Sequence, residues 1–438
     1  MPLPPEWIRF APKPRPLAGG DAWNVFLSYR SVNRPWVLNL YDVLREQGHV
    51  VFLDQCVLKA GDRLIGNLQS ALTTSQSGVL IWSQASSDSD WVQREYETME
   101  RQASGKRGFQ FVPVRLDKSN VPDFAANRIF LDFSAYPDGP NGGELLRLLH
   151  AVVGVPLSPE AAHFANEQDE AAQRDHARSR AAIANGDHER LKALFAEETL
   201  PWRTSAALGC LAAEGLTKLK KYDETMQMLE TLERRFPKAV RPRQLRALAL
   251  ARRASGDDLP RAQELLGELY ESGERDPETV GIYARTWMDR YAASGDPGLL
   301  KRSRDLYAEA FECAQDDYYT GINAAAKSVL LGDPEDLEKA AAYAQRVEGI
   351  VGAQPHPRDY WKTATVAEHL LIQRRFDDAA HTYRAAVDMA VMEIASQETT
   401  WRQACRLQRK LQAPSEAWDG IRKAFVHLAE CSTIENAA

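Results

Sequence analysis

The pattern of hydrophobic and polar positions divides the chain into two parts. Between residues 21 and 155, short apolar runs alternate with amphipathic stretches. Runs rich in Val, Ile, Leu and Phe are typical of strands buried on both faces of a sheet. The expected strands are Trp23–Leu27, Val50–Leu53, Val79–Trp82, Phe109–Val114 and a weaker Arg128–Leu131, and the expected helices are Trp36–Gln47, Leu64–Leu72, Trp91–Ala103 and Gly143–Val153. This alternation predicts an α/β fold with a flavodoxin-like parallel sheet.

After about residue 191 the strand pattern largely disappears and helical spacing dominates. A faint repeat is anchored at Tyr222, Leu259, Leu300, Leu337 and Phe376, which are 37, 41, 37 and 39 residues apart. Gly/Asp turns precede several anchors, so each unit is expected to be a helix, a turn and a second helix that starts with the anchor. Periods near this length predict an all-α helix-pair solenoid. An irregular helical bundle is the alternative.

The same pattern sets the expected domain limits. Residues 1–20 hold six prolines and end in two glycines, which predicts an extended or disordered leader. The α/β domain follows at residues 21–155, and residues 156–185 are expected to form a connector helix. The helical repeat domain is expected over residues 186–438.

Composition narrows the functional classes. The hydrophobic share is 44%, the charged share 26% and the formal net charge −7, which suits a soluble globular protein and argues against a nucleic-acid role. No apolar stretch is long enough to cross a membrane. The five cysteines are scattered and predict reduced thiols in a cytoplasmic protein. The nine histidines form no metal-ligand pattern, and no motif for ATP hydrolysis, a Rossmann redox site or a serine hydrolase is present.

Polar residues gather where the expected strands end. Ser28, Tyr29 and Arg30 leave the first strand, Asp54 follows the second with Gly61 and Asp62 in the loop beyond, and Ser83 follows the third. Because the carboxyl ends of parallel strands meet at one edge, these residues can face one cleft.

Trp91 and Glu95 lie four residues apart near the start of the next helix and share one helix face. A carboxylate beside a large aromatic ring can stabilise positive charge that develops on a sugar ring. The alternative is an ordinary exposed helix with a half-buried Trp and a solvated Glu.

In order along residues 21–155, several segments resemble the Toll/interleukin-1 receptor (TIR) domain family. They are Phe26–Arg30, Asp54 through Gly61-Asp62, Gln69–Leu72 leading into Val79–Ser83, Ser86–Glu95 with its Trp-x-x-x-Glu, and Phe111–Val114. The resemblance implies an enzyme that cleaves the nicotinamide–ribose bond of NAD⁺, with Glu95 as the essential glutamate. NAD⁺ is then the substrate, and no cofactor or metal is expected.

The resemblance also assigns expected roles around Glu95. Phe26 and Trp82 could stack on nicotinamide or adenine, or could fill the core. Arg30 could meet a phosphate or a ribose hydroxyl, or could be a surface residue, and Ser28, Tyr29 and Ser83 line the same cleft. Trp91 is expected to be a wedge that fixes Glu95. Position 92 is Val where many relatives have Cys.

The loop Gln55–Arg63, flanked by Asp54 and containing Gly61 and Asp62, often reaches a neighbouring TIR domain in the family. This implies activation by self-association. The products would be nicotinamide and ADP-ribose or a cyclic isomer, and such proteins often serve bacterial antiviral or abortive-infection defence. The alternative is a non-catalytic signalling adaptor.

The second part of the chain resembles tetratricopeptide-like arrays. One segment, Asp359–Thr365 with Glu368 and then Phe376–Ala380, resembles the TRAFs-binding region. The resemblance implies a protein-interaction scaffold or a regulatory region that receives an unknown trigger.

Overall fold

The computed structural model describes residues 3–53, 70–84, 90–105, 108–119, 129–357, 359–389 and 394–428, with the backbone alone at residues 90–95 and 395. Contacts between Cα atoms divide the chain into two compact units, Met1–Glu278 and Thr279–Ala438. The first unit therefore contains the α/β domain together with several of the helices that follow it.

The α/β domain alternates strands and helices as the sequence predicts. Its elements are α1 (Pro5–Phe10), β1 (Trp23–Ser28), η1 (Ser31–Asn33), α2 (Arg34–Glu46), β2 (Val51–Phe52), β3 (Ser75–Trp82), α4 (Asp90–Gly105), β4 (Gln110–Arg115), β5 (Leu131–Asp132) and α5 (Gly142–Val153). The strands form one sheet in the order β2-β1-β3-β4-β5 and every pairing is parallel. This is the flavodoxin-like order, which confirms the predicted fold class.

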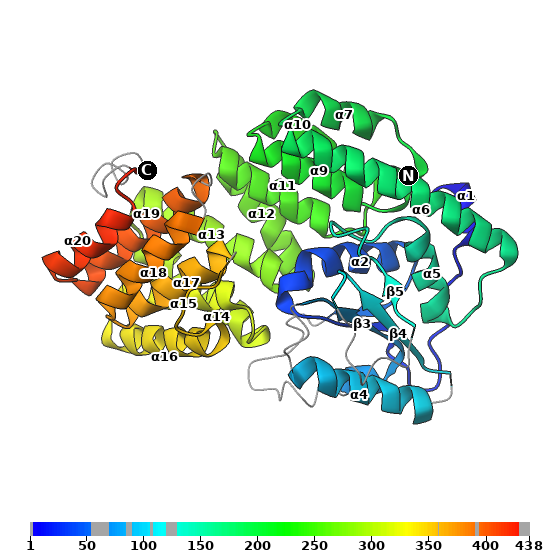
Figure 1. Cartoon of the computed structure of the whole chain (residues 1–438), viewed down its shortest axis with the longest axis horizontal. Helices are drawn as coiled ribbons and strands as arrows, with labels where there is room; N and C mark the ends of the chain where they lie inside the picture. Colours follow the sequence, from blue (N-terminus) through cyan, green and yellow to red (C-terminus); the bar gives the residue numbers. More distant parts are fainter. Residues whose placement is uncertain are drawn as a thin grey trace. The chain divides into compact units, whose positions relative to one another are not determined.

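Helices cover both faces of this sheet (Figure 1). Alternate residues of β1 and β3, such as Val25 and Val79, belong to the apolar cluster that also holds residues of α2 and α5. The intervening residues, such as Phe26 and Leu80, pack in a second cluster with Tyr96 and Met99 of α4. Because side chains alternate across a strand, burial on both faces explains why the strands are nearly continuous apolar runs.

The stretch expected to be a connector is packed into the first unit. It forms α6 (Pro159–Ala184), which begins at Ser158, where the hydroxyl accepts from the N–H of Ala161. Ala165 of α6 belongs to the core cluster of the sheet. A Cβ added at Gly143 of α5 would lie 2.0 Å from the carbonyl oxygen of Ala165, so the two helices approach at a distance that only glycine allows.

Part of the proline-rich leader is helical, where its composition predicts an extended or disordered segment. Residues 5–10 form α1, and the Trp7 side chain is only 1% exposed within the core cluster of the sheet. The Arg15 guanidinium donates to the carbonyl oxygens of Gly108 and Gln76 at 2.8 and 2.9 Å. Contacts with residues far along the chain therefore hold this segment, and its own composition does not reveal them.

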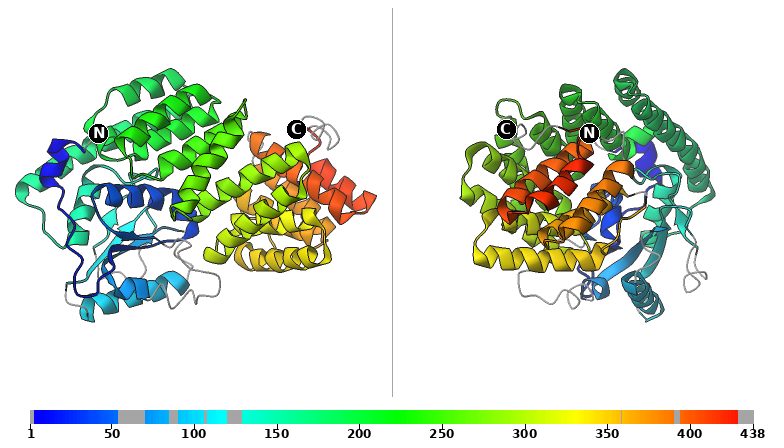
Figure 2. Two further views of the ribbon diagram at one scale, coloured as in Figure 1. Left: turned by 180° about the vertical axis from the view of Figure 1, so that it is seen from behind. Right: turned by 60° about the vertical axis from the view of Figure 1, so that its left-hand side comes forward.

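The remaining helices are α7 (His188–Ala196), α8 (Leu200–Thr204), α9 (Ala207–Lys218), α10 (Tyr222–Arg235), α11 (Arg241–Arg253), α12 (Asp258–Glu271), α13 (Pro277–Ser294), α14 (Pro297–Cys313), α15 (Tyr318–Leu331), α16 (Pro334–Val351), α17 (Tyr360–Ile372), α18 (Phe376–Met389), α19 (Ile394–Leu411) and α20 (Ser415–Ala424). Two of the predicted anchors, Tyr222 and Phe376, are the first residues of their helices. The other three anchors lie in the first turn of α12, α14 and α16. This confirms a helical array, whose last pairs are the yellow to red helices of Figure 2.

The state of the cysteines differs in part from the predicted reduced thiols. Cys210 is a buried free thiol, and burial raises its pKa well above the usual range. Cys313 and Cys405 are each disulfide-bonded. Their separation in sequence gave no indication of this.

Candidate functional site

Polar residues lie where β1 and β3 end, as predicted. Ser28 and Ser83 are buried, and Tyr29 and Arg30 are partly exposed. The Asn33 side chain donates from Nδ2 to the Ser83 hydroxyl at 2.9 Å. This hydrogen bond joins the residues that follow β1 to those that follow β3, so the ends of these two neighbouring strands are held together. Asn33 was missed in the sequence because it lies beyond the first strand, in η1.

The two predicted aromatic contacts lie inside the domain. Phe26 and Trp82 are each 2% exposed in the cluster between the sheet and α4. The Phe26 ring stacks on Phe52, with the ring centroids 5.2 Å apart. Of the two roles considered for Phe26 and Trp82, these positions favour filling the core over stacking on a ligand.

Several predicted site residues fall outside the described part of the structure. Glu95 and Trp91 belong to α4, whose backbone is described, but their side chains are not. Asp54, Gly61 and Asp62, predicted for the assembly loop, also lie outside the described residues.

Two carboxylates that the sequence analysis missed lie beyond β4 and in β5. Asp117 accepts from the backbone N–H of Gln84 at 2.7 Å and from that of Ser119 at 3.0 Å. Burial acts to raise the pKa of Asp117, but these hydrogen bonds outweigh it and hold the pKa below the usual value. Asp132 pairs with Arg115, and its pKa is likewise lowered against the effect of burial. Both carboxylates are therefore ionised at neutral pH and position the segments beside the sheet edge.

No cluster of three or more His, Cys, Asp or Glu side chains suited to a metal ion occurs in the described part of the chain. Among the same residues, no helix combines the length and apolar character needed to cross a membrane.

A second polar site joins α2 to the helices that follow the sheet, within the first unit. The Asp42 carboxylate of α2 accepts from the backbone N–H groups of Val240 and Arg241 at 2.8 and 2.9 Å. These N–H groups lie at the N-terminus of α11, where a carboxylate is favoured by the unpaired donors and the helix dipole. Asp42 is nevertheless 2% exposed, and burial raises its pKa to about 7.

Ion pairs surround this contact, which we call the α2–α11 joint. Glu274 accepts from the Arg45 guanidinium at 2.5 Å and from the Tyr41 hydroxyl at 3.2 Å. Arg241, 5% exposed, pairs with Glu214 and Glu278, each at 2.9 Å. Each buried charge of the joint therefore has a partner of opposite charge or a hydrogen-bond donor.

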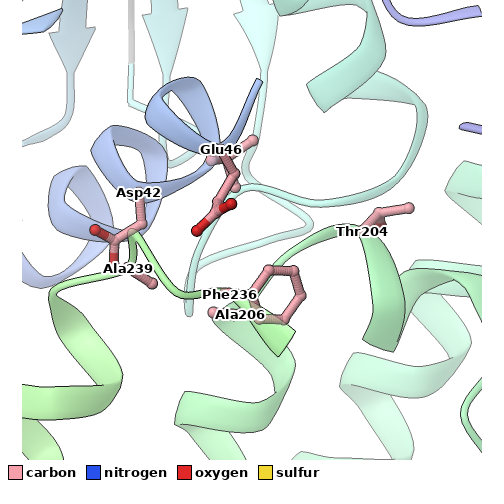
Figure 3. Close-up of a pocket in the computed structure, with 7 residues that line it drawn as sticks. Asp42, Glu46, Thr204, Ala206, Phe236 and Ala239 are labelled. Atoms are coloured by element: carbon pink, nitrogen blue, oxygen red, sulfur yellow. The ribbon is translucent and has the colours of Figure 1, made fainter. Parts of the chain in front are cut away.

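A small cavity lies beside the joint (Figure 3). Its volume is about 10 Å³, and it is lined by Asp42, Val43 and Glu46 of α2 and by Thr204, Ala206, Phe236 and Ala239. A space of this size holds about one water molecule, so it is a packing defect of the joint and cannot take a dinucleotide.

Comparison with known proteins matches each of the two parts of the chain to a family. Residues 25–147 match the TIR domain family, and residues 221–331 match the family described as Tetratricopeptide Repeats-Sensor. Among curated proteins, none matches this sequence.

Two solved structures are similar at low identity. The TIR domain of the Toll-related receptor TRR-2 from Hydra magnipapillata is 21% identical and covers 26% of this chain and 86% of its own, with a TM-score of 0.23. Yeast Tom70 is 13% identical and covers 94% of this chain and 71% of its own, with a TM-score of 0.39.

The fold and the two family matches define a two-part protein, an α/β domain followed by a helical array. More specifically, it is a TIR domain at residues 25–147 followed by a tetratricopeptide-like sensor region. The resemblance to the TRAFs-binding region rests on residues 359–380, beyond the matched repeats, and stays a prediction.

Proposed function

We propose that the TIR domain cleaves the nicotinamide–ribose bond of NAD⁺, with Glu95 as the catalytic carboxylate. The observation that carries this proposal is the edge where β1 and β3 end, with their following residues joined by the Asn33–Ser83 hydrogen bond. From this edge the chain continues into α4, and Glu95 is in its second turn. Ligands bind at such an edge in open parallel sheets. The family match adds support, since the TIR family includes NAD⁺ hydrolases.

The chemistry needs little more than one carboxylate. When the C–N bond breaks, its electron pair leaves with nicotinamide and the ribose becomes an oxocarbenium-like cation. A carboxylate beside the ring stabilises this charge, and water then adds to the anomeric carbon and loses a proton. The products are nicotinamide and ADP-ribose. Attack by a nitrogen of the adenine in place of water would give a cyclic isomer.

The other residues have supporting roles in this proposal. Tyr29 and Arg30, which are partly exposed, bind the ribose and phosphates, and Ser28 and Ser83 shape the edge beneath them. Phe26 and Trp82 pack between the sheet and α4 and stabilise the sheet there. Trp91 fixes the position of Glu95.

Self-association through the TIR domain, with Asp54, Gly61 and Asp62 in the contact loop, completes the active site in this proposal. The helical repeats scaffold the assembly or receive the trigger. Loss of NAD⁺ on assembly would suit an antiviral or abortive-infection effector.

The test is nicotinamide release from NAD⁺ by concentrated full-length protein, measured by chromatography and mass analysis alongside particle size. Glu95→Gln should lower the turnover number by at least about 100-fold, since it removes the charge that stabilises the cation. Glu97→Gln, which removes an exposed carboxylate from the same helix, serves as the matched control and should stay within about twofold of the wild type.

Two results would contradict the proposal. Equal turnover by Glu95→Gln and the wild type would remove Glu95 from the catalytic role. If the wild type assembles into large particles and releases no nicotinamide, the domain is an adaptor that signals by association.

A further inference from the structure

Charged side chains converge in the second unit, from the first helix of each of its helix pairs. They come from α13, α15, α17 and α19, and they are Arg285, Asp289, Lys327, Glu368, Arg402 and Arg406. We call this set the Lys327 cluster. Electrostatic interactions link Asp289 to Arg285, Lys327, Arg402 and Arg406, and link Lys327 to Glu368. Four cations and two acids leave an excess of two positive charges.

Lys327 lies deepest in the cluster, with 4% of its surface exposed. Its Nζ donates to Oδ1 of Asn323 at 2.6 Å and lies 5.3 Å from the centroid of the Tyr307 ring. Among the described residues, no carboxylate lies at ion-pair distance from this ammonium. Burial lowers the pKa of Lys327 to about 8, so the group is charged at neutral pH at a cost in stability.

The positive charges of two arginines of α19 are also poorly compensated by nearby carboxylates. Arg402 and Arg406 are four residues apart and share one helix face, where like charges repel. Arg402 is exposed, and Arg406 is partly exposed. Burial and the nearby Arg402 lower the pKa of Arg406. In the described part of the chain, neither guanidinium has a carboxylate at ion-pair distance.

The two acids of the cluster do not neutralise these cations closely. Asp289 is 3.8 Å from Arg285, and both side chains keep 40% of their surface exposed. Glu368 accepts from Nε2 of Gln403 at 3.0 Å, and burial raises its pKa. A purely structural network would pair its charges, because an unpaired buried charge is costly. The Lys327 cluster is partly accessible and holds more positive than negative charge, as expected where a ligand supplies the missing negative charge.

We propose that the Lys327 cluster binds the phosphate group of a small-molecule ligand, with Lys327 and Arg406 as direct contacts and Arg285 and Arg402 at its more accessible side. A phosphate monoester carries nearly two negative charges at neutral pH and several strong acceptor oxygens, which matches the excess charge. The planar guanidinium groups suit phosphate because they can donate two parallel hydrogen bonds. This site is independent of NAD⁺ cleavage by the TIR domain.

The experiment is calorimetric titration of the full chain with inorganic pyrophosphate at constant ionic strength. Wild-type protein should bind saturably. Lys327→Met and Arg406→Gln should each weaken binding by at least about tenfold, since each loses a charge-assisted hydrogen bond. Arg384→Gln, which removes an exposed guanidinium from α18, is the matched control and should bind as the wild type does. Asp289→Asn should tighten binding several-fold, because it removes a competing acid.

The gain in pyrophosphate affinity of Asp289→Asn distinguishes a binding site from a structural network. In a structural network, this substitution would lower the stability and leave the pyrophosphate affinity unchanged. Absence of saturable binding by the wild type would overturn the proposal. Equal losses in Arg384→Gln and Arg406→Gln would also overturn it, since binding would then be a general effect of charge. Tighter binding of a polyglutamate peptide than of pyrophosphate would replace the phosphate ligand by an acidic protein segment.

Discussion

The α2–α11 joint and the Lys327 cluster both bury charge, but they compensate it differently. In the joint, Asp42 meets two backbone N–H groups and Arg241 meets two glutamates at 2.9 Å. In the cluster, Lys327 meets one amide oxygen and the face of a ring, and the nearest acid–base pair is 3.8 Å apart. Buried charge with its own partners is typical of a structural contact, and buried charge without them is typical of a site that awaits a ligand.

The largest effect that we expect is the pH dependence of the free energy of unfolding that Asp42 gives to the joint. Asp42 has a folded pKa of about 7, above its ordinary value of 3.8, while Arg45 and Glu274 act on this pKa with opposite signs. Its contribution to stability is therefore full below about pH 4 and is lost as the pH rises through about 7. The loss is on the order of 2–4 kcal/mol. Asp42→Asn keeps an oxygen acceptor, so urea unfolding of this variant should depend less on pH over that range. Equal pH dependence in both proteins would show that Asp42 is already ionised.

The next largest effect on the free energy of unfolding should come from removing a paired cation from the joint. Arg241→Met leaves Glu214 and Glu278 without their shared partner and should reduce the free energy of unfolding by about 2–3 kcal/mol. The matched control is Arg243→Met, because the ion pair of Arg243 with Glu268 is more exposed and should contribute less than about 1 kcal/mol. Urea unfolding followed by tryptophan fluorescence measures both changes. A loss in Arg241→Met no larger than in Arg243→Met would mean that the joint contributes little.

The smallest expected change in stability is an increase, in the variant Lys327→Met. Lys327→Met removes a buried ammonium that lacks a close acid, so at pH 7 the second unit should become more stable by about 1 kcal/mol. The lowered pKa also predicts that wild-type stability rises between about pH 8 and 10.5, and that the variant lacks this rise. Thermal unfolding across this range checks both statements. A clear loss of stability in Lys327→Met would place Lys327 among the structural charges of the fold.

The sequence predicted the strands and the repeat well because both depend on local periodicity. The predicted run Trp23–Leu27 lies within β1, the predicted helix Gly143–Val153 is nearly the same as α5, and Tyr222 begins α10. The edge that holds Ser28 and Ser83 followed from the rule that parallel strands end on one side.

What the sequence could not predict depends on contacts between distant residues. Trp7 lies in a proline-rich stretch that appears unstructured until the core it enters is known. Asp42 looked like an ordinary polar position of an amphipathic helix, because its partners are 198 and 199 residues away. The sequence likewise did not mark Lys327 as a candidate binding residue, because the charges that surround it come from three other helices.

The apolar cluster under the sheet contains Val240 and Leu269, which belong to the repeat region by sequence, beside residues such as Val37 and Leu40 of α2. A protein truncated at residue 155 would leave part of this cluster open to water. Evolutionary exchange of the TIR domain between different sensors would then have to preserve the complementary surface of α2, or to transfer α6–α12 with it. The compact unit that contains the TIR domain in this chain is therefore larger than the TIR domain itself.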